Sequence, residues 1–405
     1  MDYAKHLSRI LNVEINSRLF IEVGYRRQLE TKSATRLMGI PESSLYLLGY
    51  PDSGIESILM KYWSPDVCYV SPRTKADHSP YANSFRLNAP YNAISLLNDL
   101  TEIIETYRPN IIILPHPEDD HTDHFATYAF ADLAINQMGW EYRKNSIIYT
   151  YITHYPDYPA PKGYYPFEKL LPPPSLLDMD TEWVELNMTH RDEHEKLAAI
   201  QLYKSQTEDN RQPLEKFERK NELFGIILDQ ELPYLELSTE GYASVNEEKK
   251  LQISKIWPNN GYIRIGISSN NKNYQNISNK SPKIEAFDVA LRGKDLIIRT
   301  SLDVDRSEDI VYWLMMDVLD KNHICRHLEI KVNVAPDKSE ISGFFADPKI
   351  VIQKEGRQLY LLIPYNSLDY SELLSLNLYI EDAQSTILDR APWRTVHIYY
   401  PKISC

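Results

Sequence analysis

Cysteine is scarce in this chain of 405 residues. Cys68, Cys325 and Cys405 lie far apart, which excludes a disulfide framework and a zinc site built from Cys-x-x-Cys pairs. Long apolar runs are missing as well: no stretch of about 20 apolar residues occurs, so no helix of this chain is expected to span a membrane. Residues 1–20 carry charged side chains throughout and do not resemble a signal peptide.

Positive charge is in deficit. The chain has 44 Lys and Arg against 57 Asp and Glu, a formal net charge of −13. Because so acidic a surface repels phosphate backbones, a nucleic-acid partner is not expected. Glycine is also sparse, with 13 residues, whereas the 29 tyrosines suit contacts with sugars and other polar ligands. The sequence leaves the localisation open between cytoplasm and export, and it does not indicate an oligomeric state.

Residues 1–238 alternate short apolar runs with helical periodicity. The runs Leu45–Leu48, Ile111–Leu114 and Ile147–Ile152 are predicted strands, and helices are predicted over Ile94–Tyr107, after His124 (residues 125–138) and over Arg191–Lys204. Strands that alternate with helices favour an α/β fold with a mainly parallel sheet and helices on both faces.

Residues 239–405 read as a separate all-β sandwich domain, for which carbohydrate binding and partner binding both stay open. Strand-like runs recur at short intervals, at Phe287–Leu291, Leu296–Thr300, Val311–Met316, Leu328–Val334, Ile350–Gln353, Leu359–Ile363, Leu376–Ile380 and Val396–Tyr400. Turns are predicted at residues 292–295 and 355–357 because each holds a glycine between polar residues. The polar stretch Ser268–Ser281 is predicted to be a loop near the boundary.

The histidines and carboxylates that could bind a metal or act in catalysis are concentrated in the segment PHPEDDHTDH (residues 115–124), directly after the predicted strand Ile111–Leu114. Ligands of open α/β sheets bind at the carboxyl ends of strands, so this is where a site is expected. His121 and His124 are three residues apart and can converge at the start of a helix. Imidazoles and carboxylates are the usual ligands of catalytic zinc. The alternative is a solvated acidic loop in which Asp120 or Asp123 caps the helix.

Two further strand ends carry polar residues. Leu45–Leu48 leads into Pro51-Asp52-Ser53-Gly54, which is either a simple turn or places Asp52 on the same rim as His121 and His124. The third run leads to His154, which we interpret as structural rather than as a ligand.

Several segments in order resemble the PIG-L/LmbE family of zinc-dependent deacetylases over about residues 20–210. They are RQLET (27–31), Ala34 with LMGI (37–40), LGYPDSG (48–54), HPEDDHTDH (116–124) and Lys196, Ala199, Ile200 and YKSQ (203–206). The resemblance implies a Rossmann-like domain and a zinc-dependent hydrolysis of N-acetyl groups on N-acetylglucosamine-like sugars or glycoconjugates.

Roles carry over from the resemblance position by position. His124 matches a metal ligand, and His121 matches the catalytic histidine that stabilises the oxyanion of the tetrahedral intermediate. Arg27 and Asp52 match substrate-binding positions, and Asp123 can orient the metal ligands from behind them.

One departure from the family concerns the metal. The opening Ala-His-Pro-Asp-Asp-Glu motif, which implies the other two zinc ligands and the general base, has no counterpart before Arg27. His6 has no adjacent carboxylate, and nothing supports His78 as a substitute. We therefore expect an incomplete zinc site, an N-terminally truncated chain and little or no activity. The competing interpretation is a catalytically inactive carbohydrate-binding protein.

Overall fold

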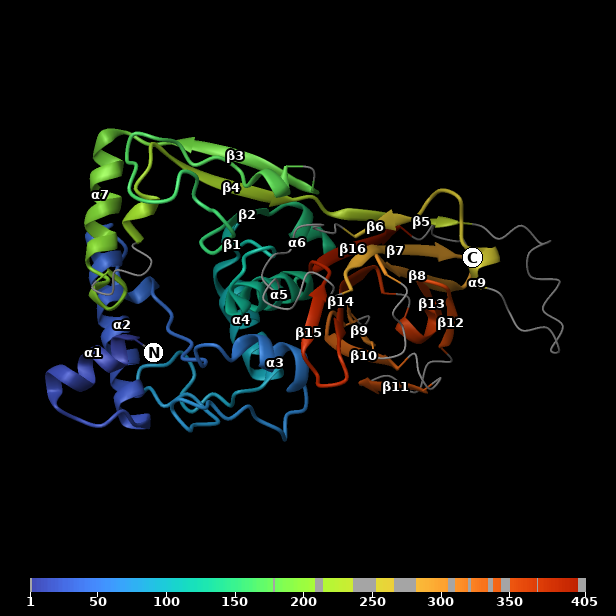
Figure 1. The fold of residues 1–405 in the computed structure, drawn as a ribbon, viewed down its shortest axis with the longest axis horizontal. Helices are drawn as coiled ribbons and strands as arrows, with labels where there is room; N and C mark the ends of the chain where they lie inside the picture. Colours follow the sequence, from blue (N-terminus) through green and yellow to red (C-terminus); the bar gives the residue numbers. More distant parts are fainter. Residues whose placement is uncertain are drawn as a thin grey trace. The chain divides into compact units, whose positions relative to one another are not determined.

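The computed structural model describes residues 2–177, 179–207, 214–235, 253–265, 282–304, 310–319, 322–333, 338–343, 350–369 and 371–399. The protein is mixed α/β, and its chain divides into two compact units (Figure 1). The first unit comprises Met1–Ala134, Ile147–Pro174 and Glu182–Ile226, and the second Ile135–Ser146, Ser175–Thr181 and Ile227–Cys405. The predicted boundary after residue 238 lies in 236–252, outside the described residues.

Helices account for much of the first unit. They are α1 (Asp2–Leu11), α2 (Ser17–Leu37), α3 (Ile55–Lys61), α4 (Ala93–Tyr107), α5 (Thr122–Gln137, whose last three residues belong to the second unit), α7 (His190–Gln201) and α8 (Lys204–Thr207). Short 3-10 segments lie at Glu42–Ser44 (η1), Pro174–Leu176 (η2), Leu214–Phe217 (η3) and, in the second unit, Tyr365–Leu368 (η4).

The three predicted helices are confirmed as α4, α5 and α7. The side chain of Asn92 accepts the Ser95 N–H at 2.9 Å and caps α4. The helix ends at Tyr107 and is followed by Arg108 in a left-handed conformation, just before Pro109. The segment predicted as Arg191–Lys204 divides into α7 and α8. Helix α5 begins at Thr122, earlier than predicted, so His124 lies in its first turn.

The sheet of the first unit has four strands in the order β1-β2-β4-β3 (Figure 1). Their bounds are β1 Ile111–Pro115, β2 Ile147–Tyr151, β3 Thr181–Asn187 and β4 Asn221–Ile227. Strands β1 and β2 are the predicted pair, and they run parallel, with Ile111 opposite Ile147. Strand β4 joins β2 in the antiparallel sense, through Thr150 and Gly225. The parallel arrangement is thus observed for β1–β2 within a mixed sheet.

The prediction of a strand at Leu45–Leu48 is wrong. The segment is extended, but within the described part of the chain it has no strand partner, and the Leu47 carbonyl instead accepts the Phe85 N–H at 2.8 Å. A strand needs a neighbouring ladder, which local sequence cannot supply. Among the described residues, nothing pairs with the outer side of β1, which is therefore an edge strand, and its Ile111 and Ile113 are each 53% exposed.

The second unit holds a large curled, mostly antiparallel sheet. Its path is β11-β10-β9-β14-β16-β5-β7-β8-β13-β12, with β15 on β14 and β6 on β7. The strands are β5 (Gln230–Leu235), β6 (Ile263–Arg264), β7 (Ile284–Arg292), β8 (Asp295–Leu302), β9 (Val311–Leu319), β10 (Cys325–Asn333), β11 (Lys338–Gly343), β12 (Val351–Glu355), β13 (Gln358–Pro364), β14 (Leu373–Glu381), β15 (Ile387–Arg390) and β16 (Arg394–Tyr399). Short helices α6 (Trp140–Lys144) and α9 (Ile253–Ile256) accompany it.

Each of the eight predicted runs overlaps a strand, whereas β5, β6, β11 and β15 were not predicted. The two predicted turns are confirmed as two-residue hairpin loops, one joining β7 to β8 and the other β12 to β13. Gly293 and Gly356 have φ of 62° and 56° in these loops, a conformation that favours glycine. Leucines and isoleucines such as Leu314, Ile330 and Leu376 form one apolar core within this unit. The predicted loop Ser268–Ser281 lies outside the described residues.

Candidate functional site

The end of β1 and the start of α5 hold the predicted histidine motif. The backbone N–H of His116 donates to the Tyr151 carbonyl at 2.8 Å, which extends the pairing of β1 with β2 by one residue. His121 precedes α5, and its Nδ1 accepts the Asp123 N–H at 3.2 Å in the manner of a capping side chain. The carboxylates of Asp120 and Asp123, the predicted caps, take no part in that bond. The helix start therefore fixes the His121 ring.

Three imidazole rings gather at this point, from His121, His124 and His154, and we name them the histidine cluster. The ring centroids lie 4.9 Å apart for His121–His124, 5.3 Å for His121–His154 and 5.1 Å for His124–His154. His154 follows the carboxyl end of β2, next to that of β1, so the parallel pairing brings it to the motif. His154, which the sequence predicts to be structural, lies beside the two motif histidines.

Asp119 organises the cluster, and sequence reasoning did not single it out. Its carboxylate is 1% exposed and accepts the backbone N–H groups of His121 (3.0 Å), Thr153 (2.8 Å) and His154 (3.0 Å). One of its oxygens also lies 3.1 Å from Nδ1 of His124. Asp119 therefore ties the loop after β2 to the loop after β1.

Burial and charge shift two groups in the cluster. Burial alone would raise the pKa of Asp119, but the contact with His124 and the backbone N–H groups of His154 and Thr153 outweigh it and lower that pKa. Burial is the main cause of a lowered pKa for His154, to which the charges of His124 and His121 add, against the opposing charge of Asp119. The site thus favours an ionised carboxylate beside a neutral His154.

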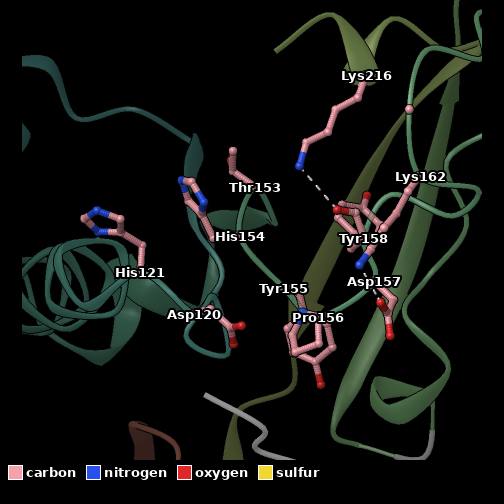
Figure 2. A pocket seen from close by; sticks show the side chains of 11 residues that line it. Asp120, His121, Thr153, His154, Tyr155, Pro156, Asp157, Tyr158, Lys162 and Lys216 are labelled. Atoms are coloured by element: carbon pink, nitrogen blue, oxygen red, sulfur yellow. Dashed lines mark hydrogen bonds and ion pairs between the residues drawn. The ribbon is translucent and has the colours of Figure 1, made fainter. Parts of the chain in front are cut away.

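The hydrogen bonding of His121 fixes which of its nitrogens can act on a ligand. Because Nδ1 accepts the Asp123 N–H, the neutral ring carries its proton on Nε2. His121 lines a cavity of about 570 Å³ together with His154, Thr153 and Lys216 (Figure 2). A donor of this kind can stabilise a developing oxyanion in that cavity.

Asp123 connects the cluster to the second predicted strand end. Its carboxylate accepts the backbone N–H of Ser53 at 2.6 Å and that of Ile55 at 3.1 Å. It therefore holds the Pro51–Gly54 turn and the start of α3, while its own N–H positions His121.

Arg27 and Asp52 line a different cavity of about 330 Å³, together with Tyr50, Tyr81 and Tyr91. Burial lowers the pKa of Arg27. With its amide oxygen facing Arg27, Gln206 accepts from Nε at 3.0 Å and from Nη2 at 2.9 Å. Asp52 forms an ion pair with Arg73. The two positions predicted to contact substrate therefore share one cavity, and His121 belongs to the other.

The segments that carry the resemblance also meet in space. Glu30 of α2 accepts the Ser205 N–H at 2.8 Å and the Ser205 hydroxyl at 2.6 Å. This contact and the Arg27–Gln206 contact join residues that are more than 170 positions apart. The segment around α8 is thus bonded to helix α2, whose Arg27 and Gln28 line the smaller cavity.

The donor set does not fit a metal ion. Within the described ranges, no group of three or more His, Cys, Asp or Glu side chains is arranged to hold one. In the histidine cluster, Nδ1 of His121 accepts a backbone N–H and Nδ1 of His124 faces Asp119. His6 stacks on Tyr3, and His78 pairs with Asp77 at 2.6 Å.

The structure thus defines a mixed α/β domain with a histidine-rich site at the ends of two parallel strands. Residues 7–135 match the PIG-L family model, described as GlcNAc-PI de-N-acetylase, and this match confirms the predicted resemblance for that segment. The family is a deacetylase-type family that acts on N-acetylated sugars and is generally metal-dependent. No curated protein matches the chain significantly. Among the described residues, no helix has the length and apolar character needed to cross a membrane.

Proposed function

We propose that this chain is a deacetylase-type amide hydrolase that removes N-acetyl groups from N-acetylglucosamine-like sugars or glycoconjugates. The observation that carries the proposal is the family match over residues 7–135, which ends just beyond the histidine motif. The cavity beside His121 supports it, because about 570 Å³ falls within the range of small-molecule sites.

The chain's own residues supply part of the chemistry. Hydrolysis of an acetamide adds water to the carbonyl carbon, places negative charge on the carbonyl oxygen and expels the amine. His121 would donate its Nε2 proton in a hydrogen bond to that oxygen, and Asp119 would keep the cluster in place. Arg27 and Asp52 would contact the polar groups of the substrate from the smaller cavity.

Zinc is the metal that the resemblance implies, and His124 would be one of its ligands. The described residues contain no group of three ligands that would hold it. We propose further that residues 1–238 carry the deacetylase-type function and that residues 239–405, a β-sandwich by prediction, bind carbohydrate or a partner.

A second candidate is a non-catalytic carbohydrate-binding protein. Two observations favour it: the missing three-ligand group among the described residues, and the ion pair that engages Asp52 with Arg73. In that case the cavities would bind a sugar without hydrolysing it.

Measurements of bound metal and of acetate release separate the two candidates. The full chain is purified, its zinc is quantified, and acetate released from N-acetylglucosamine and its glycosides is followed with and without added zinc. Turnover that disappears in His121→Ala supports the hydrolase. Saturable sugar binding without acetate release at any zinc concentration contradicts the hydrolase and supports the binding protein.

A further inference from the structure

Three aromatic side chains that neither candidate function uses are exposed on one loop of the first unit. Tyr164, Tyr165 and Phe167 are 54%, 45% and 82% exposed. They belong to residues 161–168, which we name the aromatic loop. This loop lies beyond residues 7–135, so the family match does not cover it. Exposed rings that gather in this way are typical of a binding surface, because large apolar groups gain free energy on leaving water.

The aromatic loop forms part of the wall of the larger cavity. Its residues Lys162 and Gly163 line that cavity, as His121 does (Figure 2). A Cβ on Gly163 would lie 3.4 Å from the ring of Tyr165, so this ring packs directly against a residue of the wall. A ligand that is longer than the cavity and leaves it at Gly163 therefore meets the Tyr165 ring.

Other side chains of the first unit hold the loop and its rings. The buried guanidinium of Arg219 donates to two backbone carbonyls of the aromatic loop, at 2.8 and 3.1 Å. The same guanidinium lies 5.6 Å from the centre of the Tyr165 ring, and Nζ of Lys220 lies 5.4 Å from the centre of the Phe167 ring. Because the chain already orders these groups, a ligand that binds to them loses little free energy in fixing them.

The charges that line the cavity balance. Two carboxylates, those of Asp120 and Asp157, are matched by two ammonium groups, those of Lys162 and Lys216. Lys162 pairs with Asp157 at 2.7 Å. Since neither sign of charge is in excess, the lining suits an uncharged ligand. The hydroxyl groups of a neutral sugar can donate to the carboxylates and accept from the ammonium groups.

We propose that this site binds uncharged oligosaccharides: one sugar ring occupies the cavity, and the rings that follow it in the oligosaccharide stack on Tyr165 and Phe167. The inference rests on the proposed function, because it names the substrate class of the same site. A cavity of about 570 Å³ has the size that surrounds a small molecule, so a longer saccharide continues over the surface. Aromatic rings offer the apolar faces of sugar rings a flat contact, while the sugar hydroxyls stay in water.

A lipid surface fits the aromatic loop less well. The charged side chains of Lys162, Glu168 and Lys169 are exposed among and beside the rings, and they would have to leave water if the loop entered lipid. The net charge of −13 also opposes the approach of the chain to anionic lipids.

Binding to the full chain tests the proposal without requiring turnover. Calorimetry compares N-acetylglucosamine with its β-1,4-linked dimer and tetramer and with its β-1,6-linked tetramer. We expect at least one tetramer to bind about tenfold or more tightly than the monomer, because each stacked sugar ring removes further apolar surface from water. High salt should leave this preference unchanged, since the contact involves no charge on the ligand.

Variants assign the preference to the aromatic loop. Phe167→Ala and Tyr165→Ala should each lower the affinity for the preferred tetramer by about threefold or more and leave that for the monomer unchanged. Phe167→Tyr and Tyr165→Phe should retain the preference. Leu87→Ala is the matched control, because Leu87 is 64% exposed and lines neither cavity. Thermal melting verifies folding, and Phe167→Leu, which removes the flat ring but keeps an apolar side chain, replaces an alanine variant that does not fold.

The outcomes distinguish this inference from the proposed function. Equal affinities for the monomer and both tetramers, or a preference that survives in Phe167→Ala and Tyr165→Ala, overturn the oligosaccharide surface and leave the proposed function standing. Binding to phosphatidylcholine vesicles that is lost in Phe167→Ala, without a preference for tetramers, would assign the rings to a lipid surface instead. Failure of every sugar to bind, the monomer included, overturns the proposed function and the oligosaccharide surface with it.

Discussion

The Asp123 carboxylate accepts the backbone N–H of Ser53 at 2.6 Å and so joins the first turn of α5 to the turn before α3. The same carboxylate accepts the Ile55 N–H, and the Asp123 backbone N–H donates to His121. One residue therefore fixes both the Pro51–Gly54 turn and the ring that faces the larger cavity.

Asp123→Ala should destabilise the first unit by about 1–3 kcal/mol, because two backbone N–H groups lose their charged acceptor. Asp123→Asn should cost less, since its amide oxygen can keep one of the bonds. Chemical denaturation measures the change in free energy of unfolding. Asp66→Ala is the control on an exposed side chain and should stay within about 0.5 kcal/mol. An Asp123→Ala variant as stable as the control contradicts the assigned role.

His121→Ala should lower kcat for acetate release by about 10²–10³-fold if the proposed function holds, because a donor to the oxyanion is lost. KM should change little, since the interaction belongs to the transition state. The substitution His190→Gln, on a side chain that is 85% exposed, provides the control. A rise in KM at constant kcat would instead assign His121 to ground-state binding of the sugar.

Gly24 lies within α2, where a Cβ would collide with the hydroxyl of Tyr81. Gly24→Ala should therefore destabilise the chain by about 1–3 kcal/mol through overpacking. In a Tyr81→Ala background the same change should stabilise it by up to about 1 kcal/mol, because alanine favours a helix more than glycine does. A double-mutant cycle of unfolding free energies measures the reversal of sign. If Gly24→Ala changes the free energy of unfolding equally in both backgrounds, the Tyr81 side chain moves aside without an energetic cost.

His327 predicts a pH dependence in the second unit. Burial would lower its pKa, but Asp317 at 2.9 Å and Glu329 at 3.1 Å outweigh burial and raise the pKa to about 9. The stabilisation by the charged ring is complete below the unfolded pKa of about 6.5 and is lost as the pH rises toward about 9.

Unfolding of the native chain should therefore become easier between about pH 6.5 and 9. His327→Gln should flatten the profile over that interval, while the exposed substitution His190→Gln should preserve it. Denaturant midpoints at several pH values supply the measurement. A native profile that is flat over this range would show that the ring stays neutral.

Local pattern was enough for elements whose causes lie within a few residues. The periodicity of α4 and the glycines at 293 and 356 act through neighbouring backbone, so the helix and both hairpins were predictable. The strand at Leu45–Leu48 was not, because strand formation requires a partner elsewhere in the chain. The antiparallel pairing of β4 with β2 has the same cause, since it depends on residues 75 positions apart.

The residues of the candidate site also fall into those that local sequence predicts and those that it does not. His121 and His124 were visible as a spaced motif, whereas Asp119 acts on backbone N–H groups 34 and 35 residues away. An acidic residue in an acidic loop carries no local sign of such a role. The position of Lys216 in the cavity could not be predicted from local sequence either, because this cavity forms only when η3 folds beside the loop after β2.

The outer edge of β1 has a consequence for the protein in concentrated solution. Ile111 and Ile113 are half-exposed on a strand that, among the described residues, pairs on one side alone. Such an edge is a template for strands of other molecules, so self-association should grow with concentration. The substitution Ile113→Lys would place a charge on this edge and oppose self-association. Light scattering would then show a narrower distribution of particle sizes.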